Sequence, residues 1–338
     1  MTEELIRLEH GGGGKLMRQL IEEVVIPSFA LQKVEGGVGL LEEDDGAVIP
    51  LGDGFLVVTT DSYTIKPIFF PGGDIGRLAI SGTINDLAVM GAKPIALTSA
   101  VVLEEGFPIS QLKRILNSMN KTLIEVGIPS IAGDTKVVEK GELDNLIITT
   151  TGIGYTSIPV YDCGLNPGDR IIVTGPIGTH EMALLSKREG LKFETTLKSD
   201  VAPLWQIVEP ALKAGNITAM KDPTRGGVAA TLNEMARKSQ VDITVWEEMV
   251  PIEEEVRGVA EMLGLDPFEA ANEGIIVMGV ANEDVETVFK AVKSTKYGRN
   301  VAVVGKAEKG DGLVLIETSA GGKRIMEEPI GSPLPRIC

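Results

Sequence analysis

With 338 residues, 43% of them hydrophobic and 24% charged, the chain is long enough for two globular domains and too apolar to be disordered. Its 48 acidic residues outnumber the 32 basic ones, and the formal net charge of -16 repels nucleic acid and anionic membrane surfaces, so neither is an expected partner. An anionic ligand would need cations or backbone donors to bind, which favours bridging metal ions.

The opening segment MTEELIRLEH carries acids among its apolar residues, unlike a signal peptide, and no later apolar run is long enough to span a bilayer. We therefore predict a cytoplasmic protein. A reducing cytosol would leave its two cysteines, Cys163 and Cys338, as free thiols.

The N-terminal half predicts a glycine-rich segment and a helix over residues 1–40, followed by an α/β (α+β) domain over residues 41–157. The glycine run HGGGG precedes KLMRQLIEEVV, which has the apolar spacing of an amphipathic helix. β-Branched runs predict strands at FLVVTTD, PIALTSAVVLE and NLIITTTGIGYT. Helical patterns alternate with them at DIGRLAISGTINDLAVMGA and ISQLKRILNSMNKTLIEVG.

Turn-forming residues gather at SIPVYDCGLNPGD, and we place a domain boundary there, at residues 157 to 168. Over residues 168–320 the mixed pattern returns. Strands are predicted at RIIVTG, GIIVMGVA and VAVVGKAEKGDGLVLIE, and helices at GGVAATLNEMARKS and NEDVETVFKAVKS. After them the pattern dissolves, and three prolines predict that residues 321–338 form an extended, mobile tail that ends in Cys338.

Four acidic segments lie where strands end or helices begin, and together they have the character of a cation site. They are EEDDGAV with Asp44 and Asp45, TTDSY with Asp61, GTINDLAVMGA with Asp86, and AGDTK with Asp134. Several ionised carboxylates share a pocket only when a cation neutralises them, and Mg²⁺ is the hard, oxygen-seeking cation that also bridges phosphates. Taken alone, each acid could instead cap a helix or form a turn.

Asp86 is the most informative of these acids, because a charge in such an apolar helical pattern is costly if it is buried and unpaired. The alternative is a position on the solvent face of the helix. Lys136 lies two residues beyond Asp134, so both side chains share one face if the segment is extended. Such a pair is usually a surface ion pair.

Two segments of the second half add candidates for anion binding and catalysis. MKDPTRGGVAATLNEMA has the layout of an anion-binding helix start, although Gly226 and Gly227 could serve only close packing. Asn272 and Glu273 directly precede a predicted strand, where turn formation explains them equally well. The run HGGGG could close over phosphates or act as a flexible hinge.

In this order, the segments resemble the superfamily of aminoimidazole ribonucleotide synthetase, thiamine-monophosphate kinase and selenophosphate synthetase, over about residues 40–320. EDDGAVI resembles its acidic metal and phosphate motif, TTDSY and TINDLAVMGAKPIAL its next two acidic segments, and DPTRGGVA its second-domain phosphate loop. HGGGGKLMRQLIEEV, PGGDIGRLAISGTINDLA and the terminal PRIC resemble the HypE family of hydrogenase-maturation carbamoyl dehydratases. A thiamine-monophosphate kinase would lack the terminal cysteine.

The resemblance implies a two-domain fold of the aminoimidazole-ribonucleotide-synthetase type, in which two N-terminal domains pair into a shared β-barrel and form a homodimer. ATP would lie in the cleft beside the barrel. Carried over position by position, the resemblance implies Mg²⁺ ligands at Asp45, Asp86 and Asp222. Further contacts to the nucleotide would come from Asp61, Asp134, Thr135, Lys136, Gly226 and Gly227.

The resemblance also implies a reaction. A partner enzyme, HypF, would place a carbamoyl group on Cys338, and ATP-dependent dehydration would turn this thiocarbamate into a thiocyanate. A HypC–HypD complex would then accept the cyanide ligand for the metal centre of [NiFe]-hydrogenase. Lys136 would offset charge on the transferring phosphoryl group, and Glu273 is the candidate base.

Two other functions remain open from the residues. The chain could be a small-molecule kinase of the same superfamily, with Cys338 as an incidental thiol. It could also be a non-catalytic scaffold that a nucleotide switches and whose proline-rich tail docks partners. Nucleotide turnover that requires a carbamoylated tail would distinguish the three functions.

Overall fold

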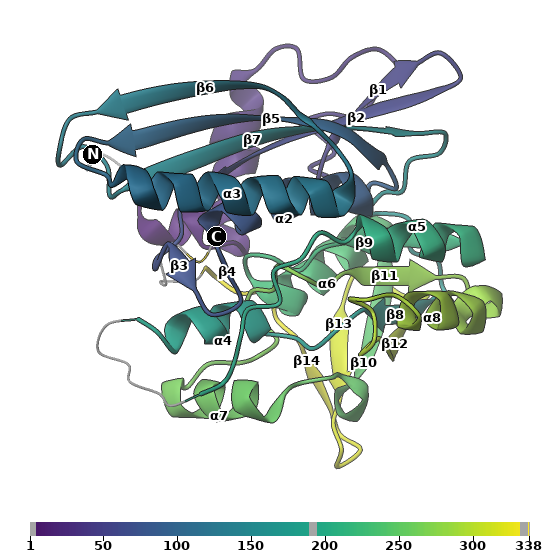
Figure 1. The fold of residues 1–338 in the computed structure, drawn as a ribbon. Helices are drawn as coiled ribbons and strands as arrows, with labels where there is room; N and C mark the ends of the chain where they lie inside the picture. Colours follow the sequence, from purple (N-terminus) through teal and green to yellow (C-terminus); the bar gives the residue numbers. More distant parts are fainter. Residues whose placement is uncertain (1–4, 189–194, 332–336, 338) are drawn as a thin grey trace.

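The computed structural model describes residues 5–188, 195–331 and 337. Its N-terminal domain is a five-stranded sheet with helices on one face (Figure 1). The strand order is β1-β2-β7-β5-β6, antiparallel except for the β5–β6 pair. The strands are β1 (Ala47–Leu51), β2 (Gly54–Tyr63), β5 (Lys93–Glu104), β6 (Ser130–Val138) and β7 (Leu146–Thr156). Helices α2 (Ile75–Val89) and α3 (Ile109–Val126) cover one face, and β3 (Phe69–Phe70) pairs with β4 (Gly73–Asp74) in a short hairpin.

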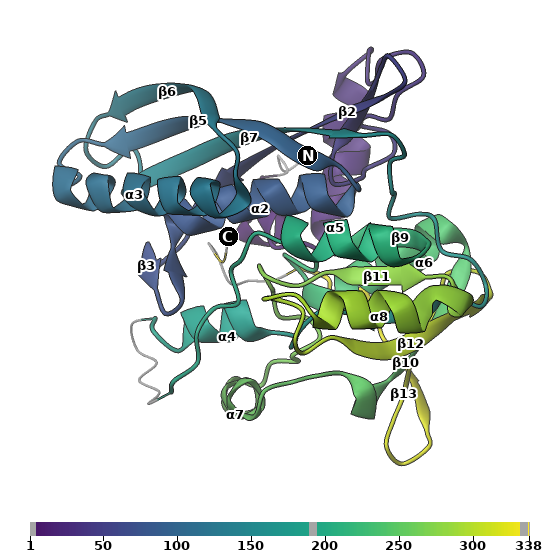
Figure 2. The same ribbon diagram turned by 45° about the vertical axis from the view of Figure 1, so that its right-hand side comes forward.

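The C-terminal domain is a seven-stranded mixed sheet in the order β14-β13-β10-β12-β8-β11-β9. Helix α6 packs on one face of this sheet, and helices α5 and α8 pack on the other (Figure 2). The strands are β8 (Arg170–Val173), β9 (Ile217–Lys221), β10 (Val241–Trp246), β11 (Val277–Val280), β12 (Ala302–Lys309), β13 (Val314–Glu317) and β14 (Lys323–Ile325). The helices are α4 (Thr179–Leu185), α5 (Trp205–Ala214), α6 (Gly227–Ser239), α7 (Glu254–Leu263) and α8 (Val285–Lys293), with short 3₁₀ turns η4 (Glu247–Met249) and η5 (Asn282–Asp284).

The predicted N-terminal helix is only partly α-helical. After the short turn η1 (Leu8–Gly11), the α-helix α1 (Lys15–Leu20) continues as one π-helical turn, η2 (Ile21–Val25), and ends in the 3₁₀ turn η3 (Ile26–Ser28). Val24, Val25 and Ile26 are β-branched, and Pro27 lacks the amide hydrogen of a helical residue. The helix predicted over KLMRQLIEEVV is therefore present, but its second half is π-helical and not α-helical.

Helix α2 is buried on nearly all sides because it lies between the two domains. Leu78, Ile80 and Ile84 pack into the core of the N-terminal sheet, whereas Ala88 and Val89 pack against residues of α5 and α8. Asp74 caps the helix, since its carboxylate accepts hydrogen bonds from the first-turn amides at 2.9 and 3.0 Å. The helix thereby joins both cores and holds its polar residues at the junction.

The chain returns to the N-terminal segment before it ends. Strand β14 pairs with β13, so the prediction that regular structure stops at residue 320 is wrong for Lys323–Ile325. The carbonyls of Pro329 and Ile330 accept hydrogen bonds from the first amides of α1 at 2.9 and 3.0 Å. Cys338 lies outside the described residues, and the mobility of the tail stays a prediction. Across the described ranges, none of the helices combines the length and apolar character needed to cross a bilayer.

Asn85 links the two domains through its buried amide. Its Oδ1 accepts from the amide of Leu204 at 2.8 Å, and its Nδ2 donates to the carbonyls of Ala202 at 3.1 Å and Glu273 at 3.4 Å. Replacing Asn85 with Ala should lower the free energy of unfolding by about 2 to 3 kcal/mol, because buried backbone groups lose their partner. Urea unfolding measures this, with the exposed Asn166→Ala as control. Equal losses in both variants would contradict the assigned role.

Candidate active site

Five of the predicted acids meet where the two domains face each other. Asp45 precedes β1, Asp61 lies in β2 and Asp86 lies in α2. Asp222 follows β9, and Glu273 lies in the loop before β11. The carboxylates influence one another electrostatically across the domain junction, as their shifted pKa values show. The structure thus brings together residues that lie up to 228 positions apart in the numbering.

Burial is the main cause of the raised pKa values in this acidic cluster. It raises the pKa of Asp86 well above the ordinary value, and the charges of Asp61 and Asp222 raise it further. Burial and the charge of Asp45 raise the pKa of Asp222 to about 8. The pKa of Glu273 is also well above its ordinary value, through burial first and the charge of Asp222 second. Without a bound cation, these acids tend to keep a proton near neutral pH.

Two oxygens of the cluster are buried and have no hydrogen-bond partner among the described residues. They are Oδ2 of Asp45 and Oε1 of Glu273. Because an unpaired buried carboxylate oxygen is unfavourable, such atoms mark positions where a ligand or cation can complete the site. Asp86 differs, since its Oδ2 accepts a hydrogen bond from the Thr59 hydroxyl at 2.7 Å.

The cluster fits a metal ion that brings its own ligands. No group of three or more His, Cys, Asp or Glu side chains in the described part of the chain could hold a metal ion. Mg²⁺ in phosphate-binding sites characteristically takes one or two carboxylates and completes its shell with phosphate oxygens and water. Raised pKa values and unpartnered oxygens are consistent with such a shared site. The assignment of Asp45, Asp86 and Asp222 as Mg²⁺ ligands stays a prediction.

Two lysines that the sequence analysis missed neutralise one edge of the cluster. The Nζ of Lys221, at the end of β9, lies 2.7 Å from Oδ1 of Asp45 and 3.4 Å from Oδ2 of Asp162. The Nζ of Lys238 in α6 lies 2.7 Å from the same oxygen of Asp162, and both lysines also pair with Glu234. No local pattern distinguishes these lysines from surface ones, because their partners come from distant parts of the chain.

The predicted helix start lies beside the acids. Gly226 and Gly227 have φ of 81° and 61°, and a Cβ at Gly227 would lie 2.6 Å from the carbonyl oxygens of Phe268 and Ala270. Close packing therefore requires glycine at position 227. The run HGGGG packs against the same place, since a Cβ at Gly13 would lie 2.6 Å from the Arg225 carbonyl. That this junction binds phosphates stays a prediction.

The backbone around Glu273 is held by Asp200, another residue the sequence analysis missed. One oxygen of Asp200 accepts from the amide of Glu273 at 3.2 Å, and the other from the side chain of Asn272 at 2.7 Å and the amide of Gly274 at 3.2 Å. Burial raises the pKa of Asp200 to about 6. These bonds fix the loop, so the Glu273 carboxyl group is held in the acidic cluster.

Asp134, Thr135 and Lys136 lie apart from the acids of their own chain. They belong to β6, the edge strand of the N-terminal sheet (Figure 1). All three are exposed. The Nζ of Lys136 lies 3.1 Å from Oδ2 of Asp134, which is the surface ion pair that the sequence left open as the alternative. A single chain thus does not bring these three residues to the nucleotide site predicted for them.

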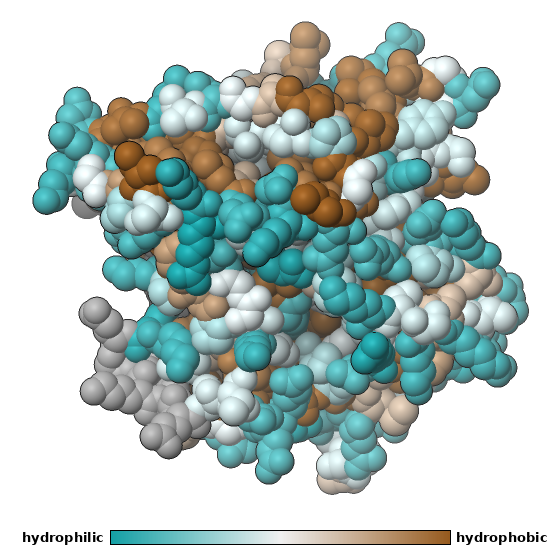
Figure 3. All heavy atoms as spheres, viewed as in Figure 1, coloured by the Kyte–Doolittle hydropathy of each residue, from teal (hydrophilic) through white to brown (hydrophobic). Residues whose placement is uncertain are grey.

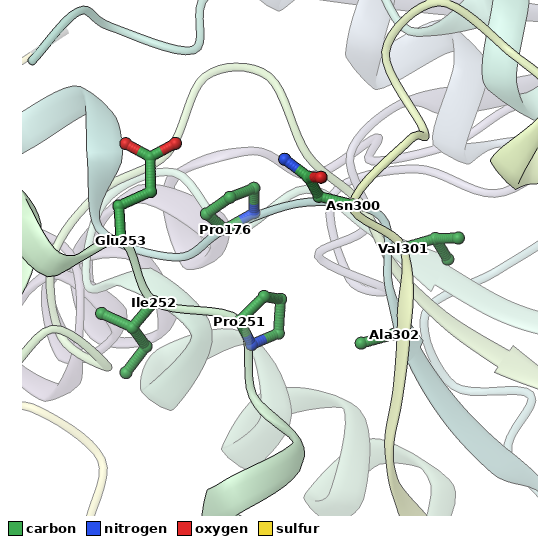
Figure 4. Close-up of a pocket in the computed structure, with 7 residues that line it drawn as sticks. All are labelled: Pro176, Pro251, Ile252, Glu253, Asn300, Val301 and Ala302. Carbon is green, nitrogen blue, oxygen red and sulfur yellow. The ribbon is translucent and has the colours of Figure 1, made fainter.

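A hollow of about 410 Å³ lies elsewhere, in the C-terminal domain (Figure 4). It is lined by Pro176, Pro251, Ile252, Glu253, Asn300, Val301 and Ala302. None of the predicted site residues lines this hollow. Among the residues that do, Glu253 alone has an ionisable side chain. We therefore assign the active site to the acidic cluster and not to this hollow.

The raised pKa of Asp222 predicts a pH-dependent stability. Between the ordinary pKa of 3.8 and about 8, the folded protein retains a proton that the unfolded chain loses, so stability falls as pH rises. Without Mg²⁺, Asp222→Asn should therefore exceed the wild type in free energy of unfolding by about 1 to 3 kcal/mol above pH 8. The difference should shrink toward about pH 4.

Urea unfolding from acid to alkaline pH measures this difference, with the exposed Asp311→Asn as the matched control. A difference between Asp222→Asn and the wild type that does not change with pH would contradict the raised pKa.

Comparison with known proteins agrees with this architecture. Residues 43–156 match the N-terminal domain of AIR synthase related proteins, and residues 166–317 match their C-terminal domain. A protein of Methanocaldococcus jannaschii named for hydrogenase expression and formation is 49% identical over 97% of this chain and 98% of its own length. The carbamoyl dehydratase HypE of Rhizobium leguminosarum bv. viciae is 43% identical over 98% of this chain and 95% of its own.

Solved structures give the same result. A crystal structure of a HypE–HypF complex contains a chain 42% identical to this one, with a TM-score of 0.86 over 92% of this chain and 99% of the other. A HypE structure in complex with ATP is 38% identical, with a TM-score of 0.82 over 99% of this chain and 100% of the other. The predicted two-domain fold is confirmed. Identity of this order over nearly the whole length shows that the chain belongs to the HypE family of hydrogenase maturation proteins, the carbamoyl dehydratases.

Proposed function

We propose that this chain is an ATP-dependent carbamoyl dehydratase of hydrogenase maturation, which converts a thiocarbamate on Cys338 into a thiocyanate. The observation that carries the proposal is the acidic cluster at the domain junction, in a chain whose relatives include named carbamoyl dehydratases and a HypE solved with ATP. The carbamoyl group would come from a HypF partner; a solved HypE–HypF complex supports the association of such proteins. A HypC–HypD complex in the cytoplasm would accept the cyanide.

The chemistry requires loss of one oxygen and two protons from the thiocarbamate. Its carbonyl oxygen accepts the γ-phosphoryl group of ATP and departs as phosphate, and the two N–H protons leave as the carbon–nitrogen triple bond forms. Mg²⁺ held by one or two carboxylates at a time from the set Asp45, Asp86 and Asp222 would supply positive charge to the phosphates. A bound cation would lower the raised pKa values of Asp86 and Asp222, which couples their ionisation to nucleotide binding.

Glu273 is the base that this geometry supports best. It would act as a base once a bound cation offsets the neighbouring charges and lets it ionise; its raised pKa then makes the carboxylate a stronger base than an exposed Glu, and its unpartnered Oε1 is available to receive a proton. Asp200 fixes the backbone of Glu273, so the carboxylate does not need to reorganise during proton transfer. Asp61, Gly226 and Gly227 would support the nucleotide beside it.

Replacing Cys338 with Ala should abolish the product while leaving ATP affinity nearly unchanged, because the sulfur carries the substrate and is no ligand of the nucleotide. The measurement is the mass of the C-terminal peptide after carbamoylation by a HypF partner and then after addition of ATP. In the wild type, carbamoylation should raise the mass of this peptide by a carbamoyl group. Addition of ATP should then lower it by one water.

The exposed Cys163→Ser is the matched control and should behave as the wild type. ATP turnover that persists in Cys338→Ala would favour the small-molecule kinase. ATP binding without turnover in the wild type would favour the scaffold.

The uncovered face of the N-terminal sheet supports the proposed homodimer. Val58, Val102, Ile147 and Ile153 point away from α2 and α3 and are only half-buried, with threonines between them. Figure 3 shows apolar side chains gathered over this end of the molecule. Edge strand β6 adds unpaired backbone groups beside this face. Pairing of two such sheets into a barrel would cover the face and place Lys136 against the second subunit.

Light scattering at micromolar concentration should therefore give the mass of two chains without any ligand. The double variant Val102→Glu and Ile153→Glu should be monomeric, because charges in the barrel would be desolvated. Leu313→Glu, at an exposed position of the C-terminal domain, is the control and should stay dimeric. A monomeric wild type would contradict the shared barrel.

A further inference from the structure

Ile337 is buried in the core of the N-terminal domain. Ile337 is 6% exposed and belongs to the same apolar cluster as Phe70, Leu184 and Val201. These residues come from both domains, so the side chain of Ile337 closes part of the junction between them. A residue next to a chain terminus is usually exposed, and its burial here requires an explanation.

His180 holds Ile337 by its backbone. The imidazole is fully buried, with Nε2 at 2.9 Å from the carbonyl oxygen of Ile337 and Nδ1 at 2.7 Å from the hydroxyl oxygen of Ser199. A carbonyl oxygen only accepts, so Nε2 carries the hydrogen, and Nδ1 accepts from the Ser199 hydroxyl. That hydroxyl oxygen accepts in turn from the amide of Val201 at 3.1 Å. Burial lowers the pKa of His180 to about 4, which keeps this tautomer neutral.

The packing around the ring restrains its orientation. The His180 and Phe70 rings meet in an edge-to-face contact at 85°, with the centroids 5.6 Å apart. With Ser199 on Nδ1 and Phe70 beside the ring, the Nε2–H bond is aimed at one place. In the described part of the chain that place is occupied by the carbonyl of Ile337, and without it a buried donor would lose its partner.

The segment that contains His180 is hydrogen-bonded to the loop that carries Glu273, the candidate base. Glu181, which follows His180, exchanges two hydrogen bonds with Ala271: its amide donates to the Ala271 carbonyl at 3.1 Å, and its Oε2 accepts from the Ala271 amide at 2.8 Å. The Gly178 amide donates to Oδ1 of Asn272 at 2.7 Å. The residues on both sides of His180 are thus fixed to the two residues that precede Glu273.

We propose that His180 is a positioning residue that fixes the end of the chain for dehydration by holding the carbonyl of Ile337. This proposal rests on the proposed function. The carbonyl that His180 holds shares one planar peptide unit with the nitrogen and Cα of Cys338. Holding that carbonyl therefore restrains where the thiocarbamate is attached, in register with the loop that carries Glu273.

The test uses full-length protein in a Cys163→Ser background, where Cys338 is the single thiol, since the chain has two cysteines. His180→Phe keeps an aromatic ring against Phe70 and removes the donor. It should raise the alkylation rate of Cys338 by a small thiol reagent by about three- to tenfold, as expected for one lost hydrogen bond. The single-turnover dehydration rate should fall by a similar factor, with thermal stability and ATP affinity near those of the background protein.

His180→Gln restores a side-chain N–H near the position of Nε2 and should return both rates toward those of the background protein. A merely structural role would not give this recovery. Ile337→Ala, at the end of the chain, covers the case in which His180→Phe does not fold. It should also raise the alkylation rate, because the apolar anchor of the same residue is lost.

Alkylation of Cys338 at an unchanged rate in both His180→Phe and Ile337→Ala would overturn the proposal. So would equal effects of His180→Phe and His180→Gln. Alkylation does not depend on the reaction, so it still decides the question if the background protein shows no dehydration. That last result would count against the proposed function and not against the hold of His180 on the chain end.

Discussion

The burial of α2 between two sheets is the constraint on which the rest of the structure depends. A helix that is apolar on nearly every side needs cover from both domains, and it receives that cover from the N-terminal sheet and from α5 and α8. Asn85 and Asp86 are carried into the junction by the same helix. The buried amide group of Asn85 is satisfied by hydrogen bonds to backbone groups of the second domain. Asp86 instead contributes to a cluster of like charges.

That cluster is unfavourable for the folded chain by itself, and the lysines offset only part of it. Lys221 pairs with one oxygen of Asp45 and leaves the other unpartnered, whereas Asp222 and Glu273 are buried among further acids. Proteins retain such electrostatic repulsion at sites where a ligand offsets it. Binding of a cation is then more favourable, because it removes the repulsion between the carboxylates. The hydrogen bonds of Asp200 hold the Glu273 loop in place against this repulsion.

The tail belongs to this same junction. The carbonyls of Pro329 and Ile330 accept hydrogen bonds from the first amides of α1, and Glu328 forms an ion pair with Arg18 at 2.9 Å. Ile337 packs in the core. The glycine-rich segment packs between the tail and the start of α6, since a Cβ at Gly14 would meet the Pro329 carbonyl. The glycine-rich segment, the stretch around Pro329 and the start of α6 therefore form one packed region.

The sequence by itself determined the type of most elements and named the acids of the cluster as candidates, but it grouped Asp134 with them, which lies apart on β6. The β-branched run FLVVTTD predicts the strand that it forms. The candidate acids lie in segments that carry recognisable motifs: Asp45, Asp61, Asp86, Asp222 and Glu273. Strand β6 had no such signal, because its residues are exposed and include Gly133 and charged side chains.

Only the tertiary structure decided which side chains pair. Lys221 reaches Asp45 across 176 positions of sequence, and His180 reaches Ile337 across 157. The tertiary structure also places Lys136 on an edge strand, away from the acids of its own chain. Local periodicity reports the face that a segment buries and says nothing of its neighbour, whereas these contacts arise from the way α2 brings the two sheets together.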